Sequence, residues 1–540
     1  MALRYRILPP DVGEEGEARS RAFRQLLYNR KVRRGLDLSR LNLSKVHDPF
    51  LMAGMAEATE RVKRAIERGE RILIHGDYDA DGITALTLLV YALRWLGADV
   101  IPFVPDRFRD GYGLSRRGVE FARKRGAKLI ITADCGVSSH AEVGMAKEYE
   151  IDVIITDHHQ LPESLPNGAI VVHPAVGGRY PDTDLTGVGV AFKFALALYE
   201  RMGKDKSVLY FLLDLVAVGT VADVGLMLGE NRLLVKHGLR LMRLGRHVKL
   251  GLQALIRQAR VHPPIGTWNI AWQIAPRINA AGRMGNSDLA MNLLISNSER
   301  EVENLARRLN DLNNLRRRRQ EELLRVLMEE ASTDSPIVFV VREDVDEGIA
   351  GILAGKLLHH FSKPAVVVSV SGGVAKGSLR SLEPFNVYEA LRGAASLFGE
   401  GDNFGGHPLA GGFRLGVDRL EALRRRLEDY ARRVLPEGRL VKVLYVDAEV
   451  EPGELDAAFW EDYGNFRPYG QGFPRPVLAI KFPTGPTYAT DRYVEYVGGG
   501  KVFRFRLPEG VAPPSSGILV VEDIRWREGR IEGDIVGFLP

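Results

Sequence analysis

Short apolar runs alternate with stretches of helical character between Arg71 and Pro174. The runs read RILI, DVIPFV, KLIIT, IDVIIT and AIVV, and most of their positions are apolar rather than alternately apolar and polar. Such strands, separated by helices, are typical of a parallel sheet that is covered on both faces. The pattern therefore predicts an α/β domain in this part of the chain.

A long helical pattern follows from Glu301 to Ala331, after a mostly helical region at 185–290. The segment contains no Gly or Pro, is rich in Leu, Arg and Glu, and repeats leucine at helical spacing. It predicts one amphipathic helix that bridges two domains. The basic cluster Arg316 to Arg319 favours a solvated helix face over a phosphate contact.

Beyond that helix the pattern changes twice. The runs PIVFVV, PAVVVSV and VAKGSLRS predict a second α/β unit, which carries the glycine-rich stretch NFGGHPLAGGF. From about Leu440, alternating strands separated by Gly and Pro turns predict a small closed β barrel, such as the oligonucleotide-binding fold. The first 50 residues are basic, are expected to be helical and carry no motif that we can interpret.

Composition limits the class of protein and the cellular compartment to which the chain can belong. The 540 residues suffice for several domains, and 45% hydrophobic with 26% charged residues is ordinary for a soluble globular protein. The single cysteine, Cys135, excludes disulfides within the chain and a zinc site built from cysteines. The start lacks a secretory signal and no apolar run approaches the ~18–20 residues that cross a bilayer. These features favour the cytoplasm, with no membrane association.

The net charge of +5 is modest, so an anionic partner must meet a local patch. Candidate chemistry follows four strand runs in succession. Their ends are followed by His75 to Asp81, by Pro105 to Arg107, by Ala133 to Cys135 and by Asp157 to His159. Ligands of open α/β sheets bind outside the carboxyl ends of the strands, so four such endings predict a site.

Three aspartates within five residues, in HGDYDADG, require an explanation because close like charges repel and buried carboxylates need a partner. Carboxylates and imidazoles together suit Mn²⁺, Mg²⁺, Fe²⁺ or Zn²⁺. The candidates are His75, Asp79, Asp81, Asp134 and the run Asp157-His158-His159. These are too many carboxylates for one cation, which indicates a pair ~3.5–4 Å apart bridged by a shared aspartate. The alternative, a solvated acidic turn and a surface loop, does not explain why they fall at successive strand ends.

A phosphate-bearing substrate would need its own ligands, and four further stretches offer them. The candidates are Arg107 and Arg109; Arg277, Asn279 and Arg283; Ser378 and Arg380; and Gly406 and His407. The alternative role for each of these arginines is a surface ion pair, and Arg277 could equally have a structural role.

Five motifs carry a resemblance. HGDYDADG, TADCG, TDHHQ and GTVADV resemble the four ordered motifs of the DHH phosphoesterase superfamily, and GGHPLAGGF resembles the signature of its DHH-associated domain. With the long helix and the C-terminal β region, the chain is similar over about residues 60–540 to the bacterial RecJ single-stranded-DNA exonucleases. The resemblance implies a parallel-sheet DHH catalytic domain (56–300), a connecting helix (301–331), a DHH-associated α/β domain (332–438) and an OB-like β barrel (439–540), preceded by the N-terminal extension (1–55) that the sequence itself predicts to be helical.

The resemblance also implies roles. One metal would be bound by His75, Asp79 and Asp134, and the other by Asp81, Asp134, His158 and Asp223, with Mn²⁺ expected first and Mg²⁺ second. His159 would face the reacting phosphate, as electrostatic stabiliser or general acid, beside Asp134 and His158. A terminal 5′ phosphate would be held by Arg109, Arg283, Ser378 and Arg380, while Gly406 and His407 would contact the strand near the scissile bond.

The implied activity is that of a two-metal-dependent 5′→3′ exonuclease, which degrades single-stranded DNA to 5′ mononucleotides in DNA repair and recombination. The resemblance further implies a monomer, with single-strand-binding protein and a helicase as partners. One alternative is a phosphoesterase of oligoribonucleotides, cyclic dinucleotides or pyrophosphate, against which the C-terminal β region argues. Another is a non-catalytic DNA-binding scaffold, against which the filled ligand positions argue. The preference for DNA over RNA stays open.

Overall fold

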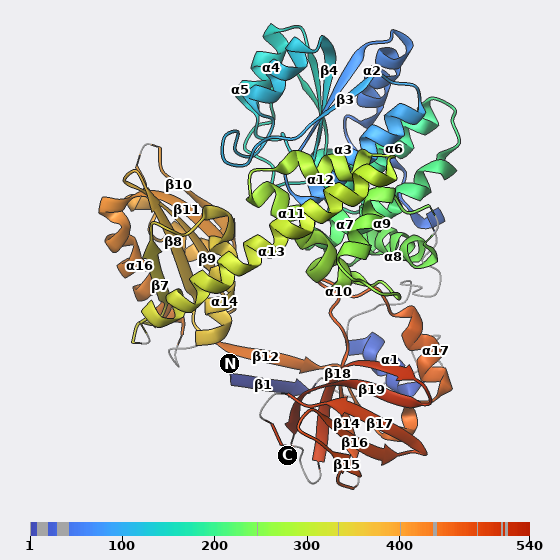
Figure 1. Ribbon diagram of the computed structural model, residues 1–540, viewed down its shortest axis with the longest axis vertical. Helices are drawn as coiled ribbons and strands as arrows, with labels where there is room; N and C mark the ends of the chain where they lie inside the picture. Colours follow the sequence, from blue (N-terminus) through green and yellow to red (C-terminus); the bar gives the residue numbers. More distant parts are fainter. Residues whose placement is uncertain are drawn as a thin grey trace.

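The computed structural model describes residues 2–7, 20–29, 43–245, 247–332, 334–399, 401–435, 440–482, 484–508, 511–512 and 517–539. Figure 1 shows three bodies, of which the first two are joined by the long helix α13 and the third, at the bottom of the view, carries the C-terminal strands. No helix among the described residues is both long enough and apolar enough to span a membrane.

The first body is built on a five-stranded sheet in the order β3-β2-β4-β5-β6, with every pairing parallel. The strands are β2 (Arg71–Gly76), β3 (Val100–Phe103), β4 (Ala127–Ala133), β5 (Asp152–Thr156) and β6 (Ala169–Val172). Ile72 and Ile74 of β2 contribute to one hydrophobic core and Leu73 to another, so both faces of the sheet are covered. The predicted parallel α/β domain is confirmed.

Helices cover the two faces and extend into a helical region that the sequence also predicts. They are α2 (Met55–Glu67), α3 (Ala80–Trp95), α4 (Arg116–Lys124), α5 (His140–Glu148), α6 (Gly187–Arg201), α7 (Leu213–Ala222), α8 (Gly229–Leu244), α9 (Leu250–Gln258), α10 (Thr267–Asn269), the π-helical turn η5 (Ile270–Ile274), α11 (Ala275–Arg283) and α12 (Ser287–Ile295). The apolar side chains of α3 and α6 share a core with Ile72 and Ile74, whereas those of α4 and α5 pack with Leu73.

The connecting helix α13 (Glu299–Glu330) is 32 residues long and confirms the predicted bridge. Its Leu309 is buried in the core of the first body and its Leu327 in the core of the second, so one helix belongs to both. The expected solvated basic face is present at Arg317 and Arg318, which are exposed. It is wrong for Arg316, which is buried because that turn of α13 faces neighbouring helices rather than solvent.

The second body has a sheet in the order β10-β11-β9-β8-β7, in which only β7 and β8 pair in parallel. The strands are β7 (Val338–Arg342), β8 (Ala365–Ser371), β9 (Val374–Arg380), β10 (Asn403–His407) and β11 (Ala410–Gly416). The helices are α14 (Glu347–Phe361), α15 (Val387–Arg392) and α16 (Leu420–Val434). This is the second α/β unit that the sequence predicts.

The third body contains a seven-stranded sheet in the order β13-β14-β18-β19-β17-β16-β15 and the helix α17 (Ala457–Asn465). The strands are β13 (Ala448–Val450), β14 (Val477–Phe482), β15 (Tyr488–Ala489), β16 (Tyr493–Gly498), β17 (Lys501–Arg506), β18 (Gly517–Arg527) and β19 (Arg530–Leu539). The expected β domain is present. A closed barrel is not confirmed, since no strand pairing among the described residues joins β13 to β15.

The N-terminal extension differs from its expected helical structure. It begins with strand β1 (Ala2–Ile7), which pairs in parallel with β12 (Val441–Val446). Helix α1 (Arg21–Asn29) follows, and its Phe23 ring lies 5.2 Å from the Phe466 ring of the third body. The expectation is therefore wrong for residues 2–7, because their pairing partner lies more than four hundred positions away. The basic stretch at 30–41 lies outside the described residues.

Candidate metal centre

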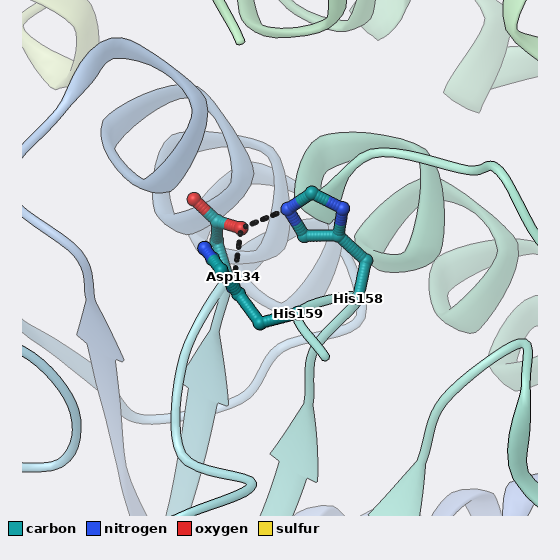
Figure 2. A group of neighbouring side chains, drawn as sticks. All are labelled: Asp134, His158 and His159. Carbon is teal, nitrogen blue, oxygen red and sulfur yellow. Dashed lines mark ion pairs between the residues drawn. The ribbon is translucent and has the colours of Figure 1, made fainter. Parts of the chain in front are cut away.

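Acidic and imidazole side chains from several elements of the first body meet at the carboxyl edge of its sheet. Three groups have ligand atoms within 4.8 Å of one another: Asp134, His158 and His159; Asp81, His158 and Asp223; and Asp77, Asp79 and Asp134. Figure 2 shows the first group, in which both histidines approach the carboxylate of Asp134. The structure thus brings together five of the six predicted ligands.

His158 lies at the centre of this arrangement. Its Nε2 is 3.1 Å from Asp134 Oδ1, 3.8 Å from Asp223 Oδ2 and 4.0 Å from Asp81 Oδ2. Burial, and then the neighbouring His159, lower the pKa of His158 to about 4, so its imidazole is neutral at neutral pH. A neutral imidazole nitrogen beside several carboxylate oxygens is a donor set that suits a divalent cation.

The carboxylates show the same deficit of positive charge. Burial raises the pKa values of Asp81 and Asp134 well above their usual range, and each carboxylate is raised further by a neighbouring one. Burial and then the charge of Asp79 raise the pKa of Asp223 to about 7. No lysine or arginine among the described residues forms an ion pair with Asp81, Asp134 or Asp223. Divalent cations are the natural partners of such a donor set.

Two buried ligand atoms test that fit directly. Asp134 Oδ1 and His158 Nε2 are buried, and neither has a hydrogen-bond partner within the part of the chain that the structure describes. Buried polar atoms are nearly always satisfied, so a pair left unsatisfied and aimed at each other is what a missing cation would explain. The residues present therefore fit a bound metal.

The backbone holds Asp134 in an uncommon conformation. Its φ of 66° lies in the left-handed region, and its N–H donates to the carbonyl of Thr156 at 3.0 Å. Non-glycine residues held there are rare and often functional. Gly187, the first residue of α6, leaves room for the side chain, because a Cβ at that position would lie 2.5 Å from the Cβ of Asp134.

Two of the three aspartates in the first loop, Asp79 and Asp81, accept hydrogen bonds from N–H groups at helix N-termini. Asp81 accepts hydrogen bonds from the N–H groups of Gly187 at 2.8 Å and Val188 at 3.0 Å, at the start of α6. Asp79 caps α3, because its Oδ1 accepts from the N–H groups of Asp81 at 2.9 Å and Gly82 at 3.0 Å. Each aspartate keeps oxygen lone pairs for a further ligand.

Asp157 orients His159 rather than joining the metal groups. Its Oδ1 accepts from the N–H of His158 at 2.7 Å and lies 2.8 Å from Nδ1 of His159. Burial would lower the pKa of His159, but the hydrogen bond and charge of Asp157 outweigh it and raise the pKa. The Nδ1 proton therefore faces Asp157, and Nε2 of this partly exposed ring is free for a substrate.

His173, which follows β6, supports the loop of His158 and His159 and is not among the site residues that the sequence predicts. Its Nε2 donates to the carbonyl of His159 at 2.8 Å and its Nδ1 accepts from the N–H of Ala175 at 3.0 Å. It therefore fixes the backbone of the loop that carries His158 and His159. The same rule of strand ends, applied to the run AIVV, would have found it.

His75 is not brought into any of these groups among the described residues. Its ring is fully buried at the end of β2, where Nε2 lies 3.0 Å from the hydroxyl of Ser115 and accepts from the N–H of Ser115 at 3.2 Å. Burial lowers its pKa to about 4. Its predicted role as a ligand remains a prediction.

The predicted phosphate ligands divide into two sets, of which the first lies between the two α/β bodies. Arg283 of α11 donates to the carbonyl of Gly348 in α14, and burial, followed by the nearby Arg107 and Arg316, lowers its pKa to about 10. Arg380 and Ser378 both lie on β9, where the guanidinium of Arg380 donates to the hydroxyl of Ser378 at 3.4 Å. These arginines are close like charges in a partly buried place, which favours a bound anion.

The remaining candidates have other partners. Arg277 donates to Asn310 at 3.1 Å, and Asn279 accepts from the N–H of Ala80 at 2.8 Å, which ties α11 to α3. Arg109 lines a surface cavity of about 480 Å³ with Tyr112 and Ser115.

Gly406 and His407 are exposed on the hairpin of β10 and β11. No interaction within the described part of the chain connects either residue with the carboxylates.

Comparisons with known proteins agree with this geometry. The family model of the DHH family N-terminal domain matches residues 71–220, and that of the DHHA1 domain matches residues 334–433. The chain is similar to "Single-stranded-DNA-specific exonuclease RecJ" of Bacillus subtilis, with 37% identity over 83% of this chain and 58% of that protein. The RecJ of Thermus thermophilus is 35% identical over 90% of this chain and 68% of that protein. The chain thus spans little more than half of the Bacillus relative.

Solved structures extend the similarity to the whole fold. The crystal structure of RecJ from Thermus thermophilus in complex with Mn²⁺ matches with a TM-score of 0.84 and 30% identity, over 100% of this chain and 80% of that one. The same protein in complex with Mg²⁺ matches with a TM-score of 0.79.

Proposed function

Because the chain belongs to the RecJ family of DHH phosphoesterases, we propose that it is a two-metal-dependent 5′→3′ exonuclease of single-stranded DNA. The observation that carries the proposal is the unsatisfied pair of Asp134 Oδ1 and His158 Nε2 among buried carboxylates. The relatives with that printed activity, and those crystallised with Mn²⁺ or Mg²⁺, support it.

Six residues would hold the cations, and five of them already lie within the metal-binding groups. Asp79 and Asp134 would bind one cation, to which His75 would belong after a change of side-chain position, and Asp81, Asp134, His158 and Asp223 would bind the other. Two bound divalent cations would supply a lowered water pKa and compensate the charge of the phosphodiester. Mn²⁺ and Mg²⁺ both suit ligands of this kind.

The chain's own groups would position the substrate and move a proton. His159, whose Nδ1 is held by Asp157, would present Nε2–H to the scissile phosphate, where a raised pKa keeps the proton available. Arg283, Ser378 and Arg380 would bind the terminal 5′ phosphate, with Arg109 as a further contact. The exposed Gly406 and His407 would approach the strand from the other domain.

A strand labelled at either end, with and without a 5′ phosphate, tests the proposal in Mn²⁺ and in Mg²⁺. We expect release of 5′ mononucleotides from the 5′ end, and no cleavage by Asp134→Ala although strand binding persists. Asp334→Ala, at an exposed loop position, is the matched control and should cleave normally. A preference for pyrophosphate or short oligoribonucleotides would replace the proposal by the phosphoesterase alternative. A wild-type protein that binds no metal and shows no turnover would indicate a scaffold.

We also propose that the enzyme acts as a monomer, as the family resemblance suggests. Single-strand-binding protein and a helicase are the partners that the family resemblance suggests. Sedimentation of the protein alone, and with each partner, tests both points.

A further inference from the structure

Two tryptophans are exposed on one helical segment of the first body. Trp268 of α10 exposes 49% of its surface and Trp272 of the turn η5 exposes 69%, the largest exposed fraction among the large hydrophobic residues described. Tryptophan is mostly buried in folded proteins, and exposed apolar surface of this size commonly marks a binding site. Two rings four positions apart therefore indicate a surface that is covered by something else.

The segment that carries them is firmly held. Ile270 and Ile274 are fully buried on its opposite face, and Asn269 donates to Gln273 at 2.8 Å. Its middle is a π-helical turn, a rare conformation that occurs frequently at functional sites. This turn packs against α7, the helix that ends at the predicted ligand Asp223.

The segment also connects two parts of the proposed enzyme. At its start, Thr267 donates to the carbonyl of Tyr469 in the third body at 2.7 Å. At its end, α11 abuts the metal-binding loop so closely that a Cβ at Gly282 would lie 2.7 Å from the carbonyl oxygen of Tyr78. At 1.5 Å per residue, Trp272 lies about 16 Å along the helix axis from Arg283.

Basic side chains accompany the rings. Arg277 and Arg283 follow on α11, and burial with neighbouring arginines lowers the pKa of both, so several positive charges lie close together in this region. Before the rings, Arg243 donates to the carbonyl of Ile265 at 3.4 Å. Exposed aromatic rings on a segment that also carries arginines match a ligand with flat apolar groups on an anionic backbone.

We propose that Trp268 and Trp272 form a base-stacking platform for unpaired bases of the single strand, at a distance from its cleaved end. The inference rests on the proposed function, because it needs a strand whose 5′ end lies at the metal loop. Stacking on aromatic rings tolerates any base, so the platform holds the strand without reading its sequence.

The test measures binding of 5′-phosphorylated thymidine oligomers in a chelator, where cleavage cannot occur. Trp268→Ala and Trp272→Ala should each weaken binding by about 5-fold or more, since one base–aromatic stack contributes ~1–3 kcal/mol. Trp272→Phe should retain most of the affinity. Trp95→Ala is the matched control, because Trp95 is 46% exposed but lies at the far end of α3 from the metal loop.

Two further measurements separate stacking from other roles. On strands with abasic sites in place of bases, the wild type and the alanine variants should bind equally, and the salt dependence of binding should be unchanged because no phosphate contact is lost. In a length series, the variants should match the wild type on strands too short to reach the platform and differ on longer ones.

The binding test distinguishes failure of the stacking platform from failure of the proposed exonuclease function. Alanine variants that bind every strand as tightly as the wild type, or lose as much affinity on abasic strands, would overturn the platform even if exonuclease activity is present. Stacking-dependent binding by a protein without exonuclease activity would overturn the proposed function and leave the platform. Thermal unfolding of each variant identifies any that fail to fold. If Trp272→Ala fails to fold, the affinity of Trp272→Phe decides, because an aromatic ring at this position should retain most of the strand binding.

Discussion

Gly187→Ala should damage the metal centre although it replaces none of the ligands. The added Cβ would lie 2.5 Å from the Cβ of Asp134, whereas ordinary contact begins at about 3.4 Å, so the aspartate must retreat by at least about 0.9 Å. It has little freedom to do so, because its backbone is left-handed and its N–H is bonded to Thr156. A misplacement of about 1 Å can lower a rate by about 10²-fold, and disturbed support of ligands typically lowers metal affinity 10–100-fold.

Titration calorimetry with Mn²⁺, followed by a cleavage assay at saturating metal, measures both effects. Gly189→Ala, also on α6, is the matched control, because its Cβ would lie 3.1 Å from the flexible end of Leu185 and no closer than 3.6 Å to any other atom. Alanine is also the better helix former by about 1 kcal/mol, so neither variant should lose helical structure through propensity. If Gly187→Ala binds Mn²⁺ and cleaves as the wild type does, Asp134 is not confined in the way we argue.

Three other predictions follow from charges in and near the site. In metal-free protein the pKa of Asp223 is raised from 3.8 to about 7, so between these pH values the folded state holds a proton that the unfolded chain has released. The free energy of unfolding should therefore fall as the pH rises from about 4 to about 7. Calorimetry should show that Mn²⁺ restores this stability most strongly above about pH 7. Asp157→Asn should lower the pKa of His159, read by NMR titration, and slow cleavage tenfold or more while strand binding in a chelator is unchanged. Arg380→Gln, which removes a proposed ligand of the terminal 5′ phosphate, should weaken strand binding and reduce its salt slope by about 1, whereas Arg318→Gln, at an exposed position of α13, should not.

The sequence predicted what depends on local pattern. Near-continuous apolar runs identified the parallel strands, and the rule that ligands gather at strand ends located Asp134 and His158. Asp223 needed the family resemblance, because an acid at the end of a helix is usually a surface residue or cap. His173 was within reach of the same rule and was overlooked.

What depends on distant partners could not be predicted. Arg316 has the same local pattern as Arg317 and Arg318, and only the packing of α13 against its neighbours makes one of the three buried. Strand β1 required β12, from the other end of the chain. Hydrophobic periodicity describes one element at a time, so it says which face is apolar but not which element covers a polar residue.

The two halves of the proposed site differ in how much they depend on domain arrangement. The carboxylates and histidines all belong to the first body and are oriented by its own strands and helix N-termini. The proposed terminal-phosphate ligands come from both bodies, with Arg283 on α11 and Arg380 on β9, and the bond from Arg283 to Gly348 joins α11 to α14. Since α13 is one helix that packs into both cores, it sets the distance between the carboxylates of the first body and the proposed phosphate ligands of the second. We therefore expect the connecting helix, rather than any ligand, to determine which phosphodiester from the 5′ end is cleaved.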